Sequence, residues 1–426
     1  MTKFFEVLLL EFRALVRSKT VAMLLVASMS WMLVLPHIVK GDGTAAGARE
    51  LTIRFSLGGV FALLVVSLLS SATGSLAKER VARRLQLTLV RPVRYAAVAL
   101  GKIVAHVLVG VVVLALACII VALAHDTSVT CNHVLSPLMP SPQEEAKAMY
   151  RKYMEDPNTP AAVRRARKST VLRLLANRAI DRYDTIQTNS VAEWKFGGLG
   201  SLECLESLSV RMRFTNQMEM RQDVRGVFRI ADFEGVVSNV TQAVLTVPLR
   251  KRKCATNAEA LVLESSLTFE NLGSSALMLR TRRDINILAP ADSFGWNLLR
   301  AYFEMIAVLF LVVSFGVLLS AGLGRPVALF VSIVTLIVGE MSPSVVEQYP
   351  DELETNFVDR IGLVITRFAA DVTRPVSSLA PLGALSRNEC IEPCDVARLV
   401  IADIALAPLM LSFLAALAMS RKQEDM

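Results

Sequence analysis

Six long apolar runs constrain what this chain can fold into more than any other feature of its sequence. A membrane-spanning helix needs about 20 apolar residues. Five of the runs qualify clearly, and in the sixth Glu340 interrupts the apolar residues. The runs lie at 20–39, 56–76, 103–124, 301–323, 327–346 and 399–419. We therefore expect an α-helical polytopic membrane protein with six transmembrane helices.

The composition indicates that the chain also contains one sizeable water-exposed domain. Of the 426 residues, 53% are hydrophobic and only 20% are charged, whereas an ordinary soluble domain is less apolar and more charged. Residues 126–296 alone have a soluble composition. We expect three parts: 1–125 with the first three spans, 126–296 as an inserted domain, and 297–426 with the last three spans.

Lysine and arginine near the span ends predict the orientation. They gather before the first span, between spans two and three, between spans four and five, and after the last span. Cytoplasmic loops are rich in these residues. Both termini are therefore expected in the cytoplasm and residues 126–296 outside the inner (cytoplasmic) membrane, although residues 40–55, also expected outside, carry three basic residues. The net charge of +8 follows from this bias, and no nucleic-acid partner is expected.

Two stretches are expected to lie along the membrane surface. Residues 3–16 are amphipathic at helical spacing and predict an interfacial helix on the cytoplasmic side. Residues 356–374 show the same kind of pattern, with Arg360 and Arg367 on one face. We expect a helix in the outer leaflet there, and a helix of a soluble outer loop is the alternative.

The inserted domain shows a helical part followed by strand patterns. Ser141-Pro-Gln-Glu144 predicts a capping box at a helix start. Residues 207–214 alternate, with apolar side chains at every second position. Several similar runs follow, so we expect an extracytoplasmic α+β domain that contains an antiparallel β-sandwich.

Five of the six cysteines fall in segments expected outside the cytoplasm, where disulfides persist. The segment CIEPC at 390–394 is able to close a tight loop, and two further cysteines are able to staple strands. The candidate disulfide residues are Cys204, Cys254, Cys390 and Cys394. Spacing does not assign the pairs, and no histidine accompanies them at zinc-finger spacing, so no metal site is expected.

No catalytic motif is present. The chain has no phosphate-binding loop of the G-x-x-x-x-G-K-[ST] type, no H-E-x-x-H, and no convincing nucleophile–base set. We therefore expect no enzyme activity and no bound cofactor.

Polar residues within spans are candidate functional residues. His106, Glu304 and Asp403 are the intramembrane candidates. We expect Asp403 either to line a substrate path or to pair with a residue such as Arg398 or His106. Arg300 and Glu304 are four positions apart, and we expect them to form a surface pair. Lys102 is expected to extend its ammonium group to the cytoplasmic face.

The loop between spans two and three combines basic charge with an apolar stripe. Leu85, Leu89 and Val93 share one helical face, and Pro92 ends the helix. Such a helix lies on anionic lipid or fits a groove in a soluble partner, and physics alone leaves both alternatives open.

The same loop resembles that of type-2 ABC transporter permeases. That family shows an acidic residue, a leucine-rich turn, Arg-Pro-Val, and Leu-Gly-Lys at the start of the third span. Glu79, Arg91-Pro92-Val93 and Leu100-Gly101-Lys102 match, whereas Arg83-Arg84 stands where Gly-Thr is usual. The residues that the resemblance assigns to coupling with an ATPase are Glu79, Arg80, Arg83, Arg84, Leu85, Leu89, Arg91 and Pro92.

The resemblance implies the membrane subunit of an ABC exporter or related complex. A separate cytoplasmic ATPase dimer would bind ATP and Mg, and the coupling helix at about 78–92 would transmit its closure to the spans. Two permease chains, identical or related, would form the pathway, and the inserted domain would engage substrate or a periplasmic partner. The alternative is a membrane-anchored sensor, adhesion or assembly protein that presents a β domain without an ATPase.

Overall fold

The computed structural model describes most of the chain. The described residues are 2–38, 45–81, 94–125, 129–157, 159–160, 166, 168–180, 184–197, 208–214, 224–230, 233–240, 244–251, 264–348, 362, 364 and 380–424. They belong to two compact units. The helical unit comprises Met1–Thr130, Asp292–Pro343 and Ile365–Met426, and the sheet unit comprises Cys131–Ala291 and Ser344–Val364.

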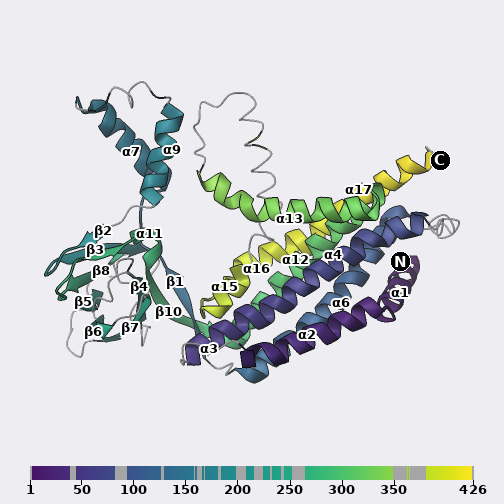
Figure 1. The fold of residues 1–426 in the computed structure, drawn as a ribbon, viewed down its shortest axis with the longest axis horizontal. Coiled ribbons are helices and arrows are strands. Elements are labelled where there is room, and N and C mark those ends of the chain that lie inside the picture. The colour runs from purple at the N-terminus through teal and green to yellow at the C-terminus, as the bar shows by residue number, and fades with distance from the viewer. Residues whose placement is uncertain are drawn as a thin grey trace. The chain divides into compact units, whose positions relative to one another are not determined.

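Four continuous helices of the helical unit are long and apolar enough to cross a membrane. They extend over Arg49–Glu79, Tyr95–Ala124, Phe294–Gly322 and Pro393–Ser420. The first overlaps α3 (Ala45–Leu51), the π-helical turn η1 (Thr52–Leu57) and α4 (Gly58–Val81), and the second and third are α6 (Tyr95–Ala124) and α12 (Phe294–Gly322). The fourth overlaps α16 (Pro393–Leu399), the π-helical turn η3 (Val400–Leu406) and α17 (Ala407–Glu424). The α-helices are labelled in Figure 1. These four correspond to the second, third, fourth and sixth expected spans.

The other two expected spans differ from the prediction. α1 (Thr2–Val16) and α2 (Lys19–Ile38) are bent by 60° relative to each other, so the pair forms a broken span or a re-entrant loop. Ser18 separates the two helices, because its Oγ accepts a hydrogen bond from Val21 N at 3.3 Å, as an N-cap does. In α13 (Arg325–Gln348) the apolar part ends at Val338 and is short for a span. Six spans are therefore not confirmed, and nearly all of the expected helix at 356–374 lies outside the described residues.

The centre of the helical unit is α12. Of the most apolar 18-residue stretch of α12, 72% is buried inside the protein, whereas the corresponding share in Pro393–Ser420 is 22%. α12 packs against α4, α6 and α17. The last helix instead leaves side chains such as Met410 and Phe413 exposed, as is expected of a helix that faces lipid.

The sheet unit is built on one antiparallel sheet of eight strands, in the order β1-β10-β4-β7-β6-β5-β8-β3. A separate pair joins β2 to β9. The strands are β1 (Thr130–Leu135), β2 (Asp184–Ile186), β3 (Val191–Gly197), β4 (Leu208–Arg213), β5 (Val224–Ile230), β6 (Phe233–Val240), β7 (Val244–Lys251), β8 (Glu264–Asn271), β9 (Leu277–Leu279) and β10 (Ile285–Ser293). The alternation expected at 207–214 is confirmed, since the apolar side chains from Leu208 to Phe214 are buried.

The large sheet curls strongly. Phe214, directly after β4, and Phe269 of β8 have ring centroids 6.2 Å apart, although three strands separate them in the sheet. Strands lie about 4.8 Å apart, so a flat sheet would hold these rings roughly 19 Å apart. Pro137, just beyond β1, also forms a bridge with Phe196 of β3, the opposite edge strand. The expected sandwich is not confirmed; this is a half-barrel whose concave face carries the core.

A helical hairpin completes the sheet unit. α7 (Pro142–Glu155) and α9 (Lys168–Ile180) share an apolar core that includes Ala146 and Leu172. α7 begins with the predicted capping box, in which Ser141 Oγ accepts from Glu144 N and the Glu144 carboxylate accepts from Ser141 N. These hydrogen bonds to the charged form lower the pKa of Glu144. On α11 (Thr281–Asp284), Arg282 forms an ion pair of 2.7 Å with Glu145 of α7.

Candidate functional site

A buried lysine joins three helices of the helical unit. Lys102, near the start of α6, is only 2% exposed. Its Nζ lies 2.9 Å from Glu11 Oε2 on α1 and 2.8 Å from Glu79 Oε1 at the end of α4. The Lys102 side chain is therefore buried between helices and does not end in open solvent. Two carboxylates hold its ammonium group inside the protein.

Gly101 explains why α1 approaches α6 so closely at this point. A Cβ atom on Gly101 would lie 3.0 Å from Val7 Cγ1 and 3.5 Å from the backbone N of Leu8. A larger residue would push α1 away and move Glu11 out of reach of Lys102. The Gly-Lys pair of the sequence thus has two local roles, since the glycine admits α1 and the lysine binds it.

The members of this charged group differ in how far they are buried. The side chains of Lys102, Glu11 and Glu79 are 3%, 15% and 30% exposed, respectively. Removing an ammonium ion from water is costly unless carboxylates replace the water. The second carboxylate gives the group a net negative charge, and Glu79, its most exposed member, keeps contact with solvent.

His106 extends the same group along α6. Its Nδ1 lies 2.8 Å from the carbonyl oxygen of Lys102, and its Nε2 lies 3.1 Å from Ser71 Oγ on α4. A carbonyl only accepts hydrogen bonds, so Nδ1 carries the proton. In the neutral ring Nε2 then accepts from the Ser71 hydroxyl. We call Glu11, Ser71, Glu79, Lys102 and His106 the polar cluster.

The polar cluster flanks the loop that the sequence singles out. Glu79 lies just before this loop and Lys102 soon after it, and their side chains are bonded to each other. Arg80 lies in α4. The other expected coupling residues, Arg83, Arg84, Leu85, Leu89, Arg91 and Pro92, lie outside the described residues. Sequence reasoning identified Glu79 and His106 but missed Glu11, whose contact with Lys102 links residues 91 positions apart.

The remaining intramembrane candidates lie elsewhere. Arg300 pairs with Asp292 at 2.6 Å and not with Glu304, which is buried. The expected Arg300–Glu304 surface pair is therefore wrong. Asp403 is buried in η3, and within the described part of the chain its Oδ2 has no hydrogen-bond partner. Of the alternatives for Asp403, pairing with His106 is excluded, because Ser71 and Lys102 occupy both nitrogens of that ring.

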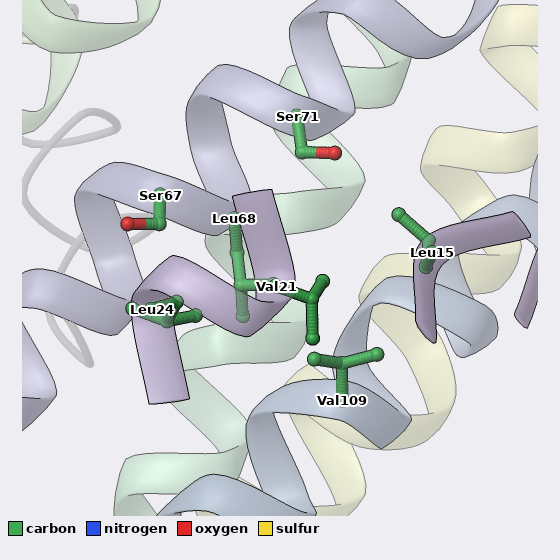
Figure 2. A pocket seen from close by; sticks show the side chains of 7 residues that line it. All are labelled: Leu15, Val21, Leu24, Ser67, Leu68, Ser71 and Val109. Atoms are coloured by element: carbon green, nitrogen blue, oxygen red, sulfur yellow. The ribbon is translucent and has the colours of Figure 1, made fainter. Parts of the chain in front are cut away.

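A small cavity adjoins the polar cluster (Figure 2). It has a volume of about 10 Å³ and is lined by Leu15, Val21, Leu24, Ser67, Leu68, Ser71 and Val109. Figure 2 shows that α4 contributes both serines, while most of the lining is aliphatic. A cavity of this size holds about one water molecule. The geometry at the cluster therefore suits a contact between helices rather than a substrate-binding site.

A second polar junction lies near the first residues of α12. Asn297 Nδ2 donates to the carbonyl of Glu389 at 2.7 Å, and Asn297 Oδ1 accepts from Ile391 N at 2.8 Å. Arg300 also donates to the carbonyl of Ile391. Asn388, with a left-handed backbone (φ 59), donates to the carbonyl of Thr130 at 2.7 Å. We call this group the Asn297 clamp.

One of the two candidate bridges, Cys390 with Cys394, is not formed. Cys131 and Cys390 are each disulfide-bonded, whereas Cys118 and Cys394 are free, the first buried and the second exposed. A bridge between Cys390 and Cys394 is therefore not the one formed. Cys204 and Cys254 lie outside the described residues. Within the described ranges, no group of three or more His, Cys, Asp or Glu residues is placed to hold a metal ion.

Comparison with known proteins adds no assignment. No family model, curated protein or solved structure matches this chain.

Proposed function

We propose that this chain is the membrane-spanning permease subunit of an ABC-type complex. The support comes from the loop at 79–102 and its resemblance to the coupling segment of type-2 ABC permeases. The observation that carries the proposal is the contact of 2.8 Å between Glu79 and Lys102. These are the acidic residue and the lysine at the two ends of that segment.

This contact gives the loop a mechanical connection to the spans. α4 leads into the loop and α6 leaves it, and the polar cluster binds both helices to α1. Separating a buried ammonium group from its carboxylates costs several kcal/mol. A force on the loop would therefore move the three helices together instead of bending the loop alone.

The proposed division of labour assigns ATP chemistry to a partner. A cytoplasmic ATPase dimer would bind ATP and Mg, and its closure would push on the coupling helix at about 78–92. Two permease chains, a homodimer or a related pair, would respond by export or by moving the sheet unit. In this proposal both termini are cytoplasmic and the sheet unit is extracytoplasmic.

The decisive experiment reconstitutes the full chain with its ATPase. The chain is extracted in mild detergent, any copurified ATPase is identified, and both are placed in nanodiscs. Leu85→Ala with Leu89→Ala should abolish ATPase binding, because a buried leucine contact is worth about 2–5 kcal/mol. Arg83→Ala and Arg84→Ala are the controls at positions that depart from the family pattern.

The alternative, a membrane-anchored sensor or adhesion module, predicts a different result. No ATPase would copurify, and the double leucine variant would behave as the wild type in every binding assay. Wild-type ATPase affinity in that variant would overturn the coupling-helix assignment.

A further inference from the structure

Two basic side chains converge beside Gly74 of α4. A Cβ atom on Gly74 would lie 3.1 Å from Arg325 Nε, 3.3 Å from Arg325 Cδ and 3.5 Å from Lys78 Cε. Arg325 comes from the first position of α13 and Lys78 from the last turns of α4. Because Gly74 has no side chain, Arg325 lies close to the α4 backbone there, with the Lys78 side chain nearby.

These two cations are not neutralised by the nearby acids. Glu79, the neighbour of Lys78, is bonded to Lys102, as is Glu11. Among the residues that the structure describes, no carboxylate forms an ion pair with Lys78 or Arg325. Both side chains are exposed. Two like charges held side by side repel each other, so their convergence favours an anion between them.

The position of the pair limits what that anion is. Lys78 lies at the end of the span Arg49–Glu79, and Arg325 follows the end of the span Phe294–Gly322. Both therefore lie where spans meet a membrane surface, at the depth of lipid headgroups.

We infer that Lys78 and Arg325 form a binding site for the phosphate group of an anionic phospholipid. Arginine offers a planar fork that matches phosphate oxygens, and lysine adds a compact positive charge. The chemistry recognised is a phosphate ester, and the position at the membrane surface selects a lipid as its source over a free phosphate. This site requires no ATPase, so it stands apart from the proposed function.

The test measures lipid binding to the full-length protein. Purified protein is titrated with phosphatidylglycerol, with phosphatidylcholine and with inorganic phosphate, and bound lipid is counted by native mass spectrometry. A basic residue near an anionic surface contributes about fivefold in affinity. Lys78→Gln with Arg325→Gln should therefore weaken phosphatidylglycerol binding by roughly 25-fold and leave phosphatidylcholine binding unchanged.

Two further variants separate this site from general charge. Arg94→Gln removes an exposed basic residue at the start of α6, and it should change phosphatidylglycerol binding by less than either Lys78→Gln or Arg325→Gln does. Gly74→Leu keeps every charge but occupies the place of Arg325, and it should weaken phosphatidylglycerol binding as Arg325→Gln does. Wild-type phosphatidylglycerol affinity in the double variant would overturn the site. Inorganic phosphate that binds as tightly as the lipid would overturn its assignment to a lipid.

Discussion

The helical unit is held together by different chemistry at the polar cluster and at the Asn297 clamp. At the cluster, one ammonium group and two carboxylates join α1, α4 and α6. At the clamp, a neutral amide pairs with two backbone groups, close to the disulfide-bonded Cys390. At Asn297 the amide donor and the amide oxygen each have a backbone partner, whereas the cluster has an excess negative charge.

This difference predicts which junction yields and which stays fixed. A neutral amide bonded in both directions has one arrangement, and any displacement leaves buried backbone groups unsatisfied. The lysine of the cluster has two partners on two helices and is able to shift its contact between them. We therefore expect motion to start at the cluster and the clamp to act as the fixed point.

The largest expected effect comes from removing the shared cation. Lys102→Met removes the cation shared by Glu11, which is largely buried, and Glu79, which is partly exposed, and losing one side of a buried ion pair costs up to about 3–5 kcal/mol. The free energy of unfolding in detergent should fall by this amount. Lys152→Met, at an exposed lysine of α7, is the matched control. Equal free energies of unfolding in the two variants would contradict a stabilising role of the polar cluster.

The disulfide of Cys390 gives the next largest effect. Cys390→Ser should lower the free energy of unfolding by about 2–4 kcal/mol, because the unfolded chain gains freedom. Cys394→Ser should leave stability unchanged, since this thiol is free and exposed. Alkylation without reductant should label Cys394 and spare Cys390. A labelled Cys390 would contradict the covalent difference between the two junctions.

Asn297→Leu sharpens the comparison at the amide itself. The substitution keeps side-chain size but leaves the carbonyl of Glu389 and the amide of Ile391 unsatisfied, which should cost about 2 kcal/mol. Asn286→Leu is the control, because its side chain accepts an exposed hydrogen bond from Ser136. Thermal unfolding of both variants measures the difference. If Asn297→Leu is no worse than the control, the clamp is not a fixed point.

The smallest effect concerns pH and His125, which follows α6 near the clamp. Burial, assisted by the positive charge of Arg49, lowers the pKa of His125. Above the ordinary histidine pKa of about 6.5 neither state is protonated and stability is unaffected. Below it the unfolded chain binds the proton first, so stability falls as the pH falls. His125→Gln should flatten this part of the curve between pH 7.5 and 5, and an unchanged curve would contradict the assignment.

Local features of this structure were predictable from sequence. The capping box of Ser141 and Glu144 and the alternation of β4 depend on residues a few positions apart, and both predictions are confirmed. The four long helices follow from length and hydropathy in the same way. Curling of the sheet depends on contacts between distant strands, such as Phe214 with Phe269, and alternation alone does not distinguish a half-barrel from a sandwich.

The candidate site was less predictable because its contacts are remote in sequence. Lys102 was predicted to extend toward the cytoplasmic face, because no residue near it in the sequence indicates that Glu11, 91 positions away, is its partner. Arg300 and Glu304 have the spacing of a helical ion pair, but Asp292 competes for the arginine at 2.6 Å. The segment CIEPC suggested a local bridge, and yet Cys394 remains free.

The neighbouring positions of β1 and β10 in the sheet have a consequence for how such a protein evolves. The chain enters the sheet unit through β1 and leaves it through β10, so entry and exit lie one strand spacing apart, about 4.8 Å. Domains with adjacent ends are easily inserted into, or deleted from, another fold. We therefore expect that replacing the residues between Thr130 and Asp292 by a short linker would leave the helical unit able to assemble.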